Sequence, residues 1–289
     1  MRASPRHHSS LFWFCLPALL LSVSVIALPA IATYAMSLTD WDGVSEPWYI
    51  GFENYQDLFA DRAFWSTMVN NGRWLIIFLT IPMALALFVS ALLTTRRKAA
   101  AVYQVIFLLP FVISPVANVG IWMNVILDNN AGLLGWIDRN ITPVGYPLGD
   151  PDTALYTVAA VNIWSFWGYL AVILFAAMRQ TPEDQLEAAY LEGANGWQIF
   201  REVTLPNILP TVALLLALVT ILSFLNFDYV FLMTGGGPAG STEMLSTLAY
   251  GFAFRTFEVG KAAAVAVVMS GFGILASFAY IFVSREALK

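Results

Sequence analysis

Polar side chains interrupt two strongly apolar segments of this 289-residue chain, and their types suit non-covalent binding of a solute. A polar group inside a membrane is energetically costly and therefore marks a candidate functional site. Amides and hydroxyls hydrogen-bond to sugars and aromatic faces stack on sugar rings, so this mixture suits a sugar. The candidate solute-path residues are Trp164, Trp167 and Tyr169, near Asn162 and Ser165, in the first segment, and Ser223, Asn226 and Asp228 in the second.

The same residues also have a packing explanation. Ser and Asn side chains often hydrogen-bond between membrane helices, and Trp fills space between them. Asp228 lies near the outer end of its segment, where it could simply be a hydrated acid facing the pathway interior. Both interpretations stay open on the sequence alone.

Patterns for covalent, nucleotide or metal chemistry are absent from the sequence. There is no G-x-x-x-x-G-K-[ST], no H-E-x-x-H and no G-x-S-x-G, and the run Gly235–Pro238 is explained by a tight turn. The two histidines, His7 and His8, and the single cysteine, Cys15, cannot build a metal cage. We therefore expect no catalytic residue, no metal ligand, no cofactor bound by this chain, no enzymatic activity and no nucleic-acid partner.

The composition places most of the chain in lipid. Hydrophobic residues make up 59% and charged residues 11% of the sequence, whereas a soluble domain carries about 25% charged residues. A helix needs about 20 apolar residues to cross a membrane. We predict an all-α integral membrane fold with six transmembrane helices, at approximately Leu11 to Met36, Trp74 to Leu93, Val102 to Leu127, Ala154 to Met178, Ile208 to Met233 and Gly260 to Val283.

A cleavable signal peptide is the alternative interpretation of the first segment. Arg2 and Arg6 give it a basic lead-in, and Ala30-Ile31-Ala32 resembles a cleavage site. Its apolar run of about 26 residues is much longer than the roughly 7–15 residues of a signal core. We expect it to be retained as a membrane anchor.

The basic residues predict the orientation, because Lys and Arg gather in cytoplasmic flanks. Nine lie on the side that holds both termini and five on the other. The predicted organisation is a cytoplasmic tail at 1–10, one domain at 11–283 in the inner membrane with a cytoplasmic loop at 179–208, and a tail at 284–289. The outer loops at 37–73, 128–153 and 234–259 are rich in aromatics, which suit either a membrane-interface belt or docking of an external protein.

The cytoplasmic loop reads RQTPEDQLEAAYLEGANGWQIFREVTLPNILP from Arg179 onward. Thr181 can cap a helix, with Pro182 in the first position and Asp184 three residues after the cap. An apolar face then recurs at helical spacing at Leu186, Tyr190, Ala194 and Trp197, although two glycines allow a turn. A solvated linker would not need these apolar residues. A helix lying on the membrane is the alternative, which the many acids and few basic residues disfavour.

This loop resembles the "EAA" signature of bacterial ABC importer permeases, E-A-A-x-x-D-G-A followed by a spacer and I-x-L-P. The matching segments are Glu187-Ala188-Ala189, Gly193-Ala194, Phe200 and Val203-Thr204-Leu205-Pro206. Glu192 replaces the usual Asp, and Val203 replaces the usual Ile. Gly51-Phe52-Glu53-Asn54-Tyr55 and the Thr234–Pro238 turn extend the resemblance over nearly the whole chain, which looks most like the first-type permease of the maltose and glycerol-3-phosphate importers.

The resemblance implies a type I importer fold and a set of partners. These are a second, different permease, two ATPase subunits that use ATP and Mg, an external solute-binding protein and a sugar-type solute. The loop would form a coupling helix in a groove of the ATPase. Residues carried over for coupling are Glu187, Ala188, Ala189, Glu192, Gly193, Ala194, Leu205 and Pro206. Glu187 would pair with a basic residue of the ATPase, or else is an exposed helix acid, and Gly193 would permit a turn and a close approach.

The resemblance also bears on the solute path. Ser223 and Asn226 fall where the maltose-type permease has solute-contacting amides, and Tyr169 falls near a contact tyrosine. The rival function is a secondary transporter driven by an ion gradient, with Asp228 as its proton or sodium site. The single intramembrane acid, the lack of an internal repeat and the EAA-like loop all argue against it.

Overall fold

The structure, a computed structural model, describes residues 7–94 and 100–287. The chain forms two compact units, one made of residues 7–61 with 249–268 and the other of residues 62–248 with 269–287. The predicted tails lie largely outside the described side chains, and so do Arg96, Arg97 and Lys98. The orientation of the termini therefore stays a prediction.

The first unit begins with a long apolar helix. It comprises α1 (His7–Ser22), a π-helical turn η1 (Val23–Ala27) and α2 (Leu28–Met36). Between residues 14 and 36 this helix has no buried side chain. An all-round apolar and exposed surface of this length is what a lipid-facing span requires.

A short segment that the sequence predicts to be an outer loop follows this first span. Strand β1 (Thr39–Asp40) pairs antiparallel with β2 (Trp48–Tyr49), with Thr39 opposite Tyr49, and α3 (Glu53–Ala60) comes next. The buried Asn54 amide donates to the carbonyl oxygens of Ser37 and Thr39, both at 2.9 Å. These bonds satisfy backbone groups that so short a sheet leaves unpaired.

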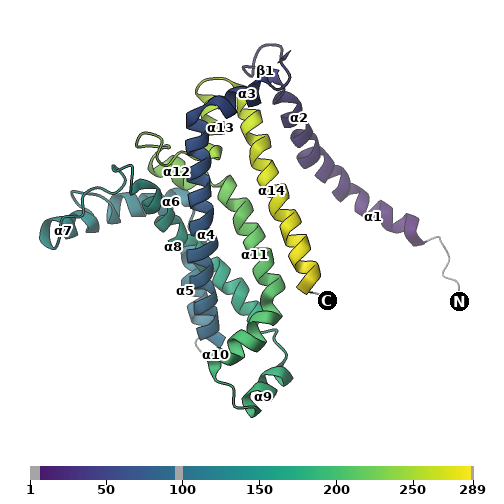
Figure 1. The fold of residues 1–289 in the computed structure, drawn as a ribbon, viewed down its shortest axis with the longest axis vertical. Helices are drawn as coiled ribbons and strands as arrows, with labels where there is room; N and C mark the ends of the chain where they lie inside the picture. The colour runs from purple at the N-terminus through teal and green to yellow at the C-terminus, as the bar shows by residue number, and fades with distance from the viewer. Residues whose placement is uncertain (1–6, 95–99, 288–289) are drawn as a thin grey trace. The chain divides into compact units, whose positions relative to one another are not determined.

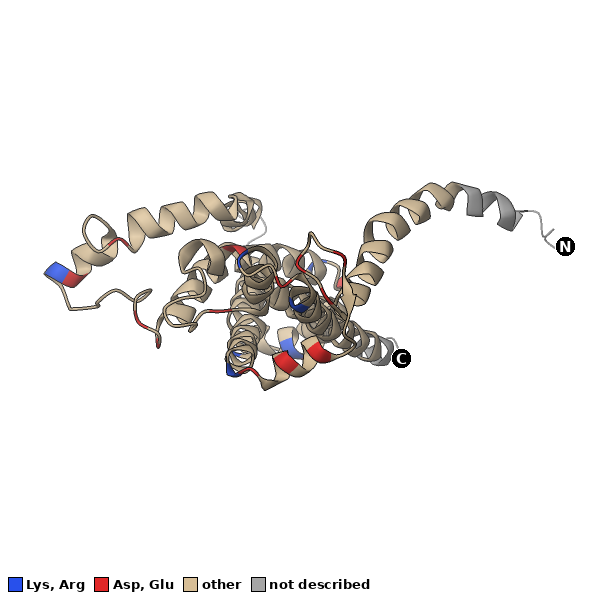
Figure 2. Cartoon of the chain, turned by 90° about the horizontal axis from the view of Figure 1, so that it is seen from above, with Lys and Arg blue, Asp and Glu red and all other residues tan. Residues whose placement is uncertain are grey.

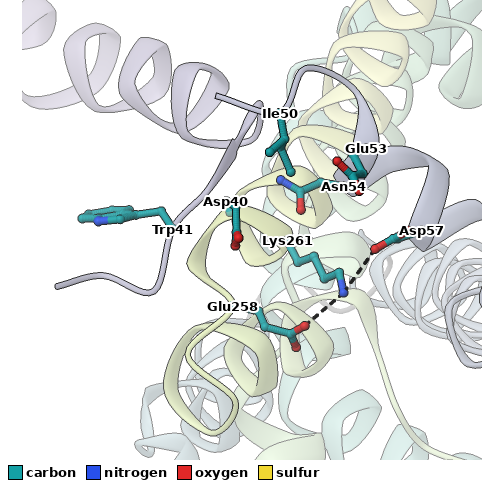
Figure 3. Close-up of a pocket in the computed structure, with 9 residues that line it drawn as sticks. Asp40, Trp41, Ile50, Glu53, Asn54, Asp57, Glu258 and Lys261 are labelled. Carbon is teal, nitrogen blue, oxygen red and sulfur yellow. Dashed lines mark hydrogen bonds and ion pairs between the residues drawn. The ribbon is translucent and has the colours of Figure 1, made fainter. Parts of the chain in front are cut away.

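A lysine joins this outer segment to the start of the last helix. Lys261 Nζ lies 3.0 Å from Glu258 Oε1 and 3.4 Å from Asp57 Oδ2, as Figure 3 shows. These groups line a polar pocket of about 220 Å³ together with Asp40 and Glu53. Lys261 is the basic residue among these acids, and its two ion pairs explain the pocket as a partly exposed charge cluster.

The second unit is a bundle built around one buried helix. Helix α8 (Ala154–Met178) packs against α4 (Arg62–Thr94), α5 (Ala100–Val112) and α11 (Leu205–Leu225). Helices α4 and α11 also contact each other and lie next to each other in Figure 1. Helix α8 buries most of its side chains, including Leu155, Leu170 and Leu174, although Tyr156 and Trp164 are exposed. It is the centre of this unit.

The remaining helices of the second unit are short. They are α6 (Pro115–Ile121) with η2 (Trp122–Ile126), α7 (Leu133–Asn140), α9 (Glu183–Leu191), α10 (Gly196–Ile199) with η3 (Phe200–Thr204), and α12 (Asp228–Met233). Helices α13 (Leu245–Phe254) and α14 (Val259–Ala287) contribute to both units. The long helices are almost entirely tan in Figure 2, so Lys, Arg, Asp and Glu are sparse along them.

The all-α membrane fold with six spans is confirmed, with corrections to individual spans. In the described residues, five helices are long and apolar enough to cross a membrane, and a sixth span is a bent pair. The fourth prediction, Ala154 to Met178, matches α8 in both bounds. The second span is longer than predicted, because α4 already begins at Arg62 and includes part of the predicted outer loop.

The third predicted span, Val102 to Leu127, is not one straight helix. It breaks between Val112 and Pro115, where its two halves meet at 95°. A residue before proline avoids the helical region, and Ser114 is extended with a ψ of 146°. Its hydroxyl then accepts the backbone N–H of Ala117 at 3.3 Å and caps the second half.

The fifth predicted span lies within one candidate span, Gly196–Met233, but its helix is interrupted near the end. Helix α11 starts at Leu205, ends at Leu225 and is followed by an extended Asn226 with a ψ of 117° before α12. No proline marks this break in the sequence. It is held by contacts from other helices, which are described below.

We predict that Gly168→Ala disrupts the second unit. A Cβ on Gly168 would overlap the backbone carbonyl oxygen of Phe107 in α5, and that backbone cannot rotate aside. Overpacking typically costs about 1–3 kcal/mol, so the thermal midpoint of the purified protein should fall by several degrees. Gly72→Ala in α4, which has open space around it, is the matched control. Equal midpoints for both variants would contradict the close α5–α8 contact.

Candidate functional site

A cavity of about 210 Å³ lies beside the break in the fifth span. Helices α4, α8, α11 and α12 and the linker between the last two supply its walls. It brings together the predicted residues Ser223, Asn226 and Asp228, and it adds Asn162 from α8. Polar groups that are 64 residues apart in the chain thus meet at one place.

One wall of the cavity is aromatic. Trp74 and Phe78 stack with ring centroids 4.8 Å apart and planes 13° from parallel, and Phe166 lies 6.1 Å from Phe78. All three rings line the cavity. None of the three was among the predicted site residues, although the spacing of Trp74 and Phe78 places both on one face of a helix.

The polar wall contains an unsatisfied amide. Asn162 Nδ2 donates to Asn226 Oδ1 across a long 3.5 Å, and the buried Asn226 Nδ2 has no hydrogen-bond partner among the described residues. Ser223 donates its hydroxyl to Val219 O at 2.7 Å within α11. A buried donor without a partner costs about 1–3 kcal/mol, so the Asn226 amide is the group in this cavity that gains most from a polar ligand or water.

The three aromatic candidates of α8 lie elsewhere and do not line this cavity. Trp164 packs edge-on against Trp122, and Trp167 lies 4.9 Å from Phe107. Tyr169 stacks on Phe111 with centroids 4.5 Å apart. These contacts fit the packing explanation, and a role for Trp164, Trp167 and Tyr169 in the solute path stays a prediction.

A buried polar network behind the cavity was missed. Asn118 Nδ2 donates to the Tyr229 hydroxyl at 2.9 Å, and that hydroxyl lies 2.8 Å from Ser165 Oγ. The buried Asn118 Oδ1 has no partner among the described residues. Asn118 is a polar residue within the predicted third span, so the criterion applied to the fourth and fifth spans would have found it.

The EAA-like loop forms two short helices rather than one. Helix α9 ends at Leu191, and Gly193 takes a φ of +82° that turns the chain into α10. A capping box starts α10, with Gln198 N donating to Asn195 Oδ1 at 3.0 Å and Asn195 N donating to Gln198 Oε1 at 2.8 Å. The single helical face predicted for Leu186, Tyr190, Ala194 and Trp197 is therefore wrong, because the chain reverses at Gly193.

The start of α9 also differs from the prediction. Pro182 occupies the cap position, and the buried Thr181 hydroxyl makes no hydrogen bond with the described residues. Proline at this position has extended backbone, with a ψ of 131°, so α9 begins only at Glu183. The turn expected at Gly193 is present. Apart from its chain neighbours, no described residue has an atom within 4 Å of the position that a Cβ on Gly193 would take.

The coupling candidates are accessible on this loop. Glu187, Ala188, Glu192 and Gly193 are exposed, Ala189 and Ala194 are half-buried, and Leu205 and Pro206 begin α11. Three large apolar side chains are exposed beside them, Tyr190 by 66%, Leu191 by 89% and Trp197 by 67%. We call these three the loop patch. Exposed apolar groups on a charged loop are typical of a protein-binding surface.

Carboxylates of the outer loops are held by backbone amides. The N–H groups of Ser45 and Val44 lower the pKa of Asp42 to about 2. Likewise the N–H groups of Ala131 and Asn130 lower the pKa of Asp128. Carboxylates with depressed pKa values keep these contacts until the pH falls well below neutral, so mild acid should leave these turns intact.

Most of the chain matches the model of a known protein family. The model described as "Binding-protein-dependent transport system inner membrane component" matches residues 73–288. The chain is 30% identical to a probable starch degradation products transport system permease protein, AmyD, of Thermoanaerobacterium thermosulfurigenes, over 89% of this chain and 88% of that protein. It is 27% identical to the trehalose/maltose transport system permease protein MalF of Thermococcus litoralis, over 92% and 90%.

Solved structures share the fold. A chain of a bacterial alginate ABC transporter, crystallised in complex with an alginate pentasaccharide-bound periplasmic protein, superposes with a TM-score of 0.81 at 21% sequence identity. The match covers 97% of this chain and 94% of that one. The likeness establishes the importer permease fold for the present chain.

We predict that Tyr229→Phe destabilises the protein, because the change removes the acceptor of the buried Asn118 amide. Leaving a buried donor unpaired costs about 1–3 kcal/mol, which a lowered thermal midpoint would report. Tyr169→Phe keeps the ring stacked on Phe111 and serves as the matched control. A Tyr229→Phe midpoint equal to that of the control would show that the network contributes nothing.

Proposed function

Because this chain belongs to the family of binding-protein-dependent transport system inner membrane components, we propose that it forms half of the translocation pathway for a sugar or sugar derivative. The chain is the multi-pass permease of an ATP-binding cassette importer in the inner membrane, and it is not an enzyme. The family gives no support to the ion-gradient alternative.

The observation that carries the proposal is the cavity beside Asn226. A stacked aromatic pair lines this cavity, and a buried amide there has no partner among the described residues. Apolar ring faces and hydrogen-bonding amides are complementary to the two kinds of surface that a sugar presents. Relatives named for starch degradation products and for trehalose and maltose support the same solute class.

In this proposal Ser223, Asn226 and Asp228 belong to the solute path, together with Asn162 and the Trp74–Phe78 pair. Asn226 supplies an amide donor, and the aromatic pair supplies a face. Asp228 is exposed at the start of α12 and adds an acceptor near the outer end of the path. A lone hydrated acid of this kind needs no role as an ion site.

The proposed partners are a second, different permease, two ATPase subunits and an external solute-binding protein. ATP and Mg would be bound by the ATPase subunits, because this sequence has no G-x-x-x-x-G-K-[ST] phosphate-binding pattern. The loop patch supports ATPase docking, since its apolar side chains are not covered by any described part of this chain and a partner could cover them. Both termini would lie on the ATPase side of the membrane.

Coupling would act through the loop. Docking of α9 and the loop patch into a groove of the ATPase is a helix-in-groove contact. Glu187 would pair with a basic residue at the rim, and the left-handed turn at Gly193 would set the angle between α9 and α10. Closure of the ATPase dimer on ATP would then displace the loop and the start of α11.

We predict that transport requires ATP and no ion gradient. Vesicles reconstituted with the full complex and its binding protein should import a labelled maltodextrin or related sugar only with ATP and Mg at the ATPase side. An ionophore should leave the uptake rate unchanged. Uptake that persists without ATP and stops with the ionophore would sink the importer mechanism.

We further predict that Gly193→Val weakens coupling while the spans still fold. A β-branched residue in the left-handed region costs about 1–2 kcal/mol, which shifts the loop out of its turn. The variant should reach the membrane in normal amount but co-purify with much less ATPase. Gly193→Asn is the control, since Asn tolerates this backbone conformation, and equal ATPase recovery for Val and Asn would argue against the turn.

A further inference from the structure

The break in the fifth span leaves backbone groups that need partners. A helix ends with carbonyl groups that lack intrahelical donors, and lipid offers no water to replace them. The Ser223 carbonyl receives the Asn71 amide at a long 3.4 Å, and the Asn226 carbonyl receives the Ser246 hydroxyl. Other helices therefore hold this end of α11.

Asn71 contacts both the end of α11 and the start of α13. Its Oδ1 accepts the backbone N–H of Leu245 at 2.8 Å, while its Nδ2 faces Ser223 O. The Asn71 side chain is fully buried in α4. One amide thus joins the end of α11 to the start of α13 across the intervening segment.

These contacts form a relay that ends in the cavity. Asn71 fixes Leu245, and the next residue, Ser246, donates its hydroxyl to Asn226 O. The Asn226 side chain then faces Asn162 in the cavity wall. We propose that Asn71 and Ser246 are positioning residues, which hold the Asn226 carboxamide in the solute path without touching the solute. The inference rests on the proposed path and adds the residues that set its geometry.

The neighbouring Asn70 provides a matched comparison. It is also buried in α4, and its Nδ2 donates to the carbonyl oxygens of Gly240 and Glu243, both at 3.1 Å. These contacts hold the glycine-rich turn and do not reach Asn226. Replacement of Asn70 removes a similar amount of buried hydrogen bonding outside the relay.

The test measures how readily water-soluble reagent reaches position 226. Cys15 is the single cysteine of the chain, so Cys15→Ser with Asn226→Cys places one thiol at the cavity. The full complex is treated in vesicles with a small charged methanethiosulfonate, and the label on this chain is followed over time. The rate is compared after adding Ser246→Ala, Ser246→Thr, Asn71→Leu or Asn70→Leu.

Ser246→Ala and Asn71→Leu should each raise the labelling rate roughly fivefold, which is the population shift that one net hydrogen bond produces. Ser246→Thr keeps the hydroxyl and should restore the rate, and Asn70→Leu should leave it unchanged. If Ser246→Ala labels at the reference rate, the positioning role is wrong while the path proposal stands. If the reference thiol never reacts, position 226 is not in a wet path and both proposals fall.

Discussion

Lipid supplies no hydrogen bonds, so every polar group within the spans needs a partner inside the protein. At the break in the fifth span, Asn71 donates to the carbonyl oxygen of Ser223 and Ser246 donates to that of Asn226. The break in turn carries Asn226 to the cavity, where its amide donor is left unsatisfied. A buried donor without a protein partner is costly, so this amide is available to a polar solute.

Helix α11 links the two functional regions of the chain. Its first residues, Leu205 and Pro206, belong to the EAA-like loop, and its last turn carries Ser223 at the cavity. Its 21 residues span about 31 Å at 1.5 Å per residue, close to the thickness of the hydrocarbon core. A displacement of the loop by the ATPase would therefore reach the solute path along one element, with Pro210 as the site where it could bend.

The sequence predicted the helices well and their breaks poorly. The segment of α8 contains no charged residue and no proline, and its length and hydropathy sufficed to predict both its bounds. Pro115 indicates a helix break, but the length of the apolar segment around it favoured a single helix. The break at Asn226 depends on contacts from α4 and α13, which no local sequence pattern reveals. Ser223 and Asn226 could be selected from the sequence because they are polar residues in an apolar segment. The aromatic wall could not, because it forms only where Trp74 and Phe78 of α4 lie beside α8 and α11. In the EAA-like loop, the turn at Gly193 could be predicted from the sequence, whereas the position of Pro182 as the N-cap of α9 could not.

The most direct test of the account is the number of solute molecules imported per ATP hydrolysed by the Asn226→Ala complex in vesicles. Loss of one net hydrogen bond to the solute, about 0.5–1.5 kcal/mol, should lower this ratio roughly twofold to tenfold. ATPase activity stimulated by the binding protein should persist, because the coupling loop is untouched. Thr220→Ala, on the same helix but outside this cavity, should leave the ratio unchanged. A parallel fall of uptake and ATPase activity, or an unchanged ratio, would show that Asn226 serves packing and that the solute passes elsewhere.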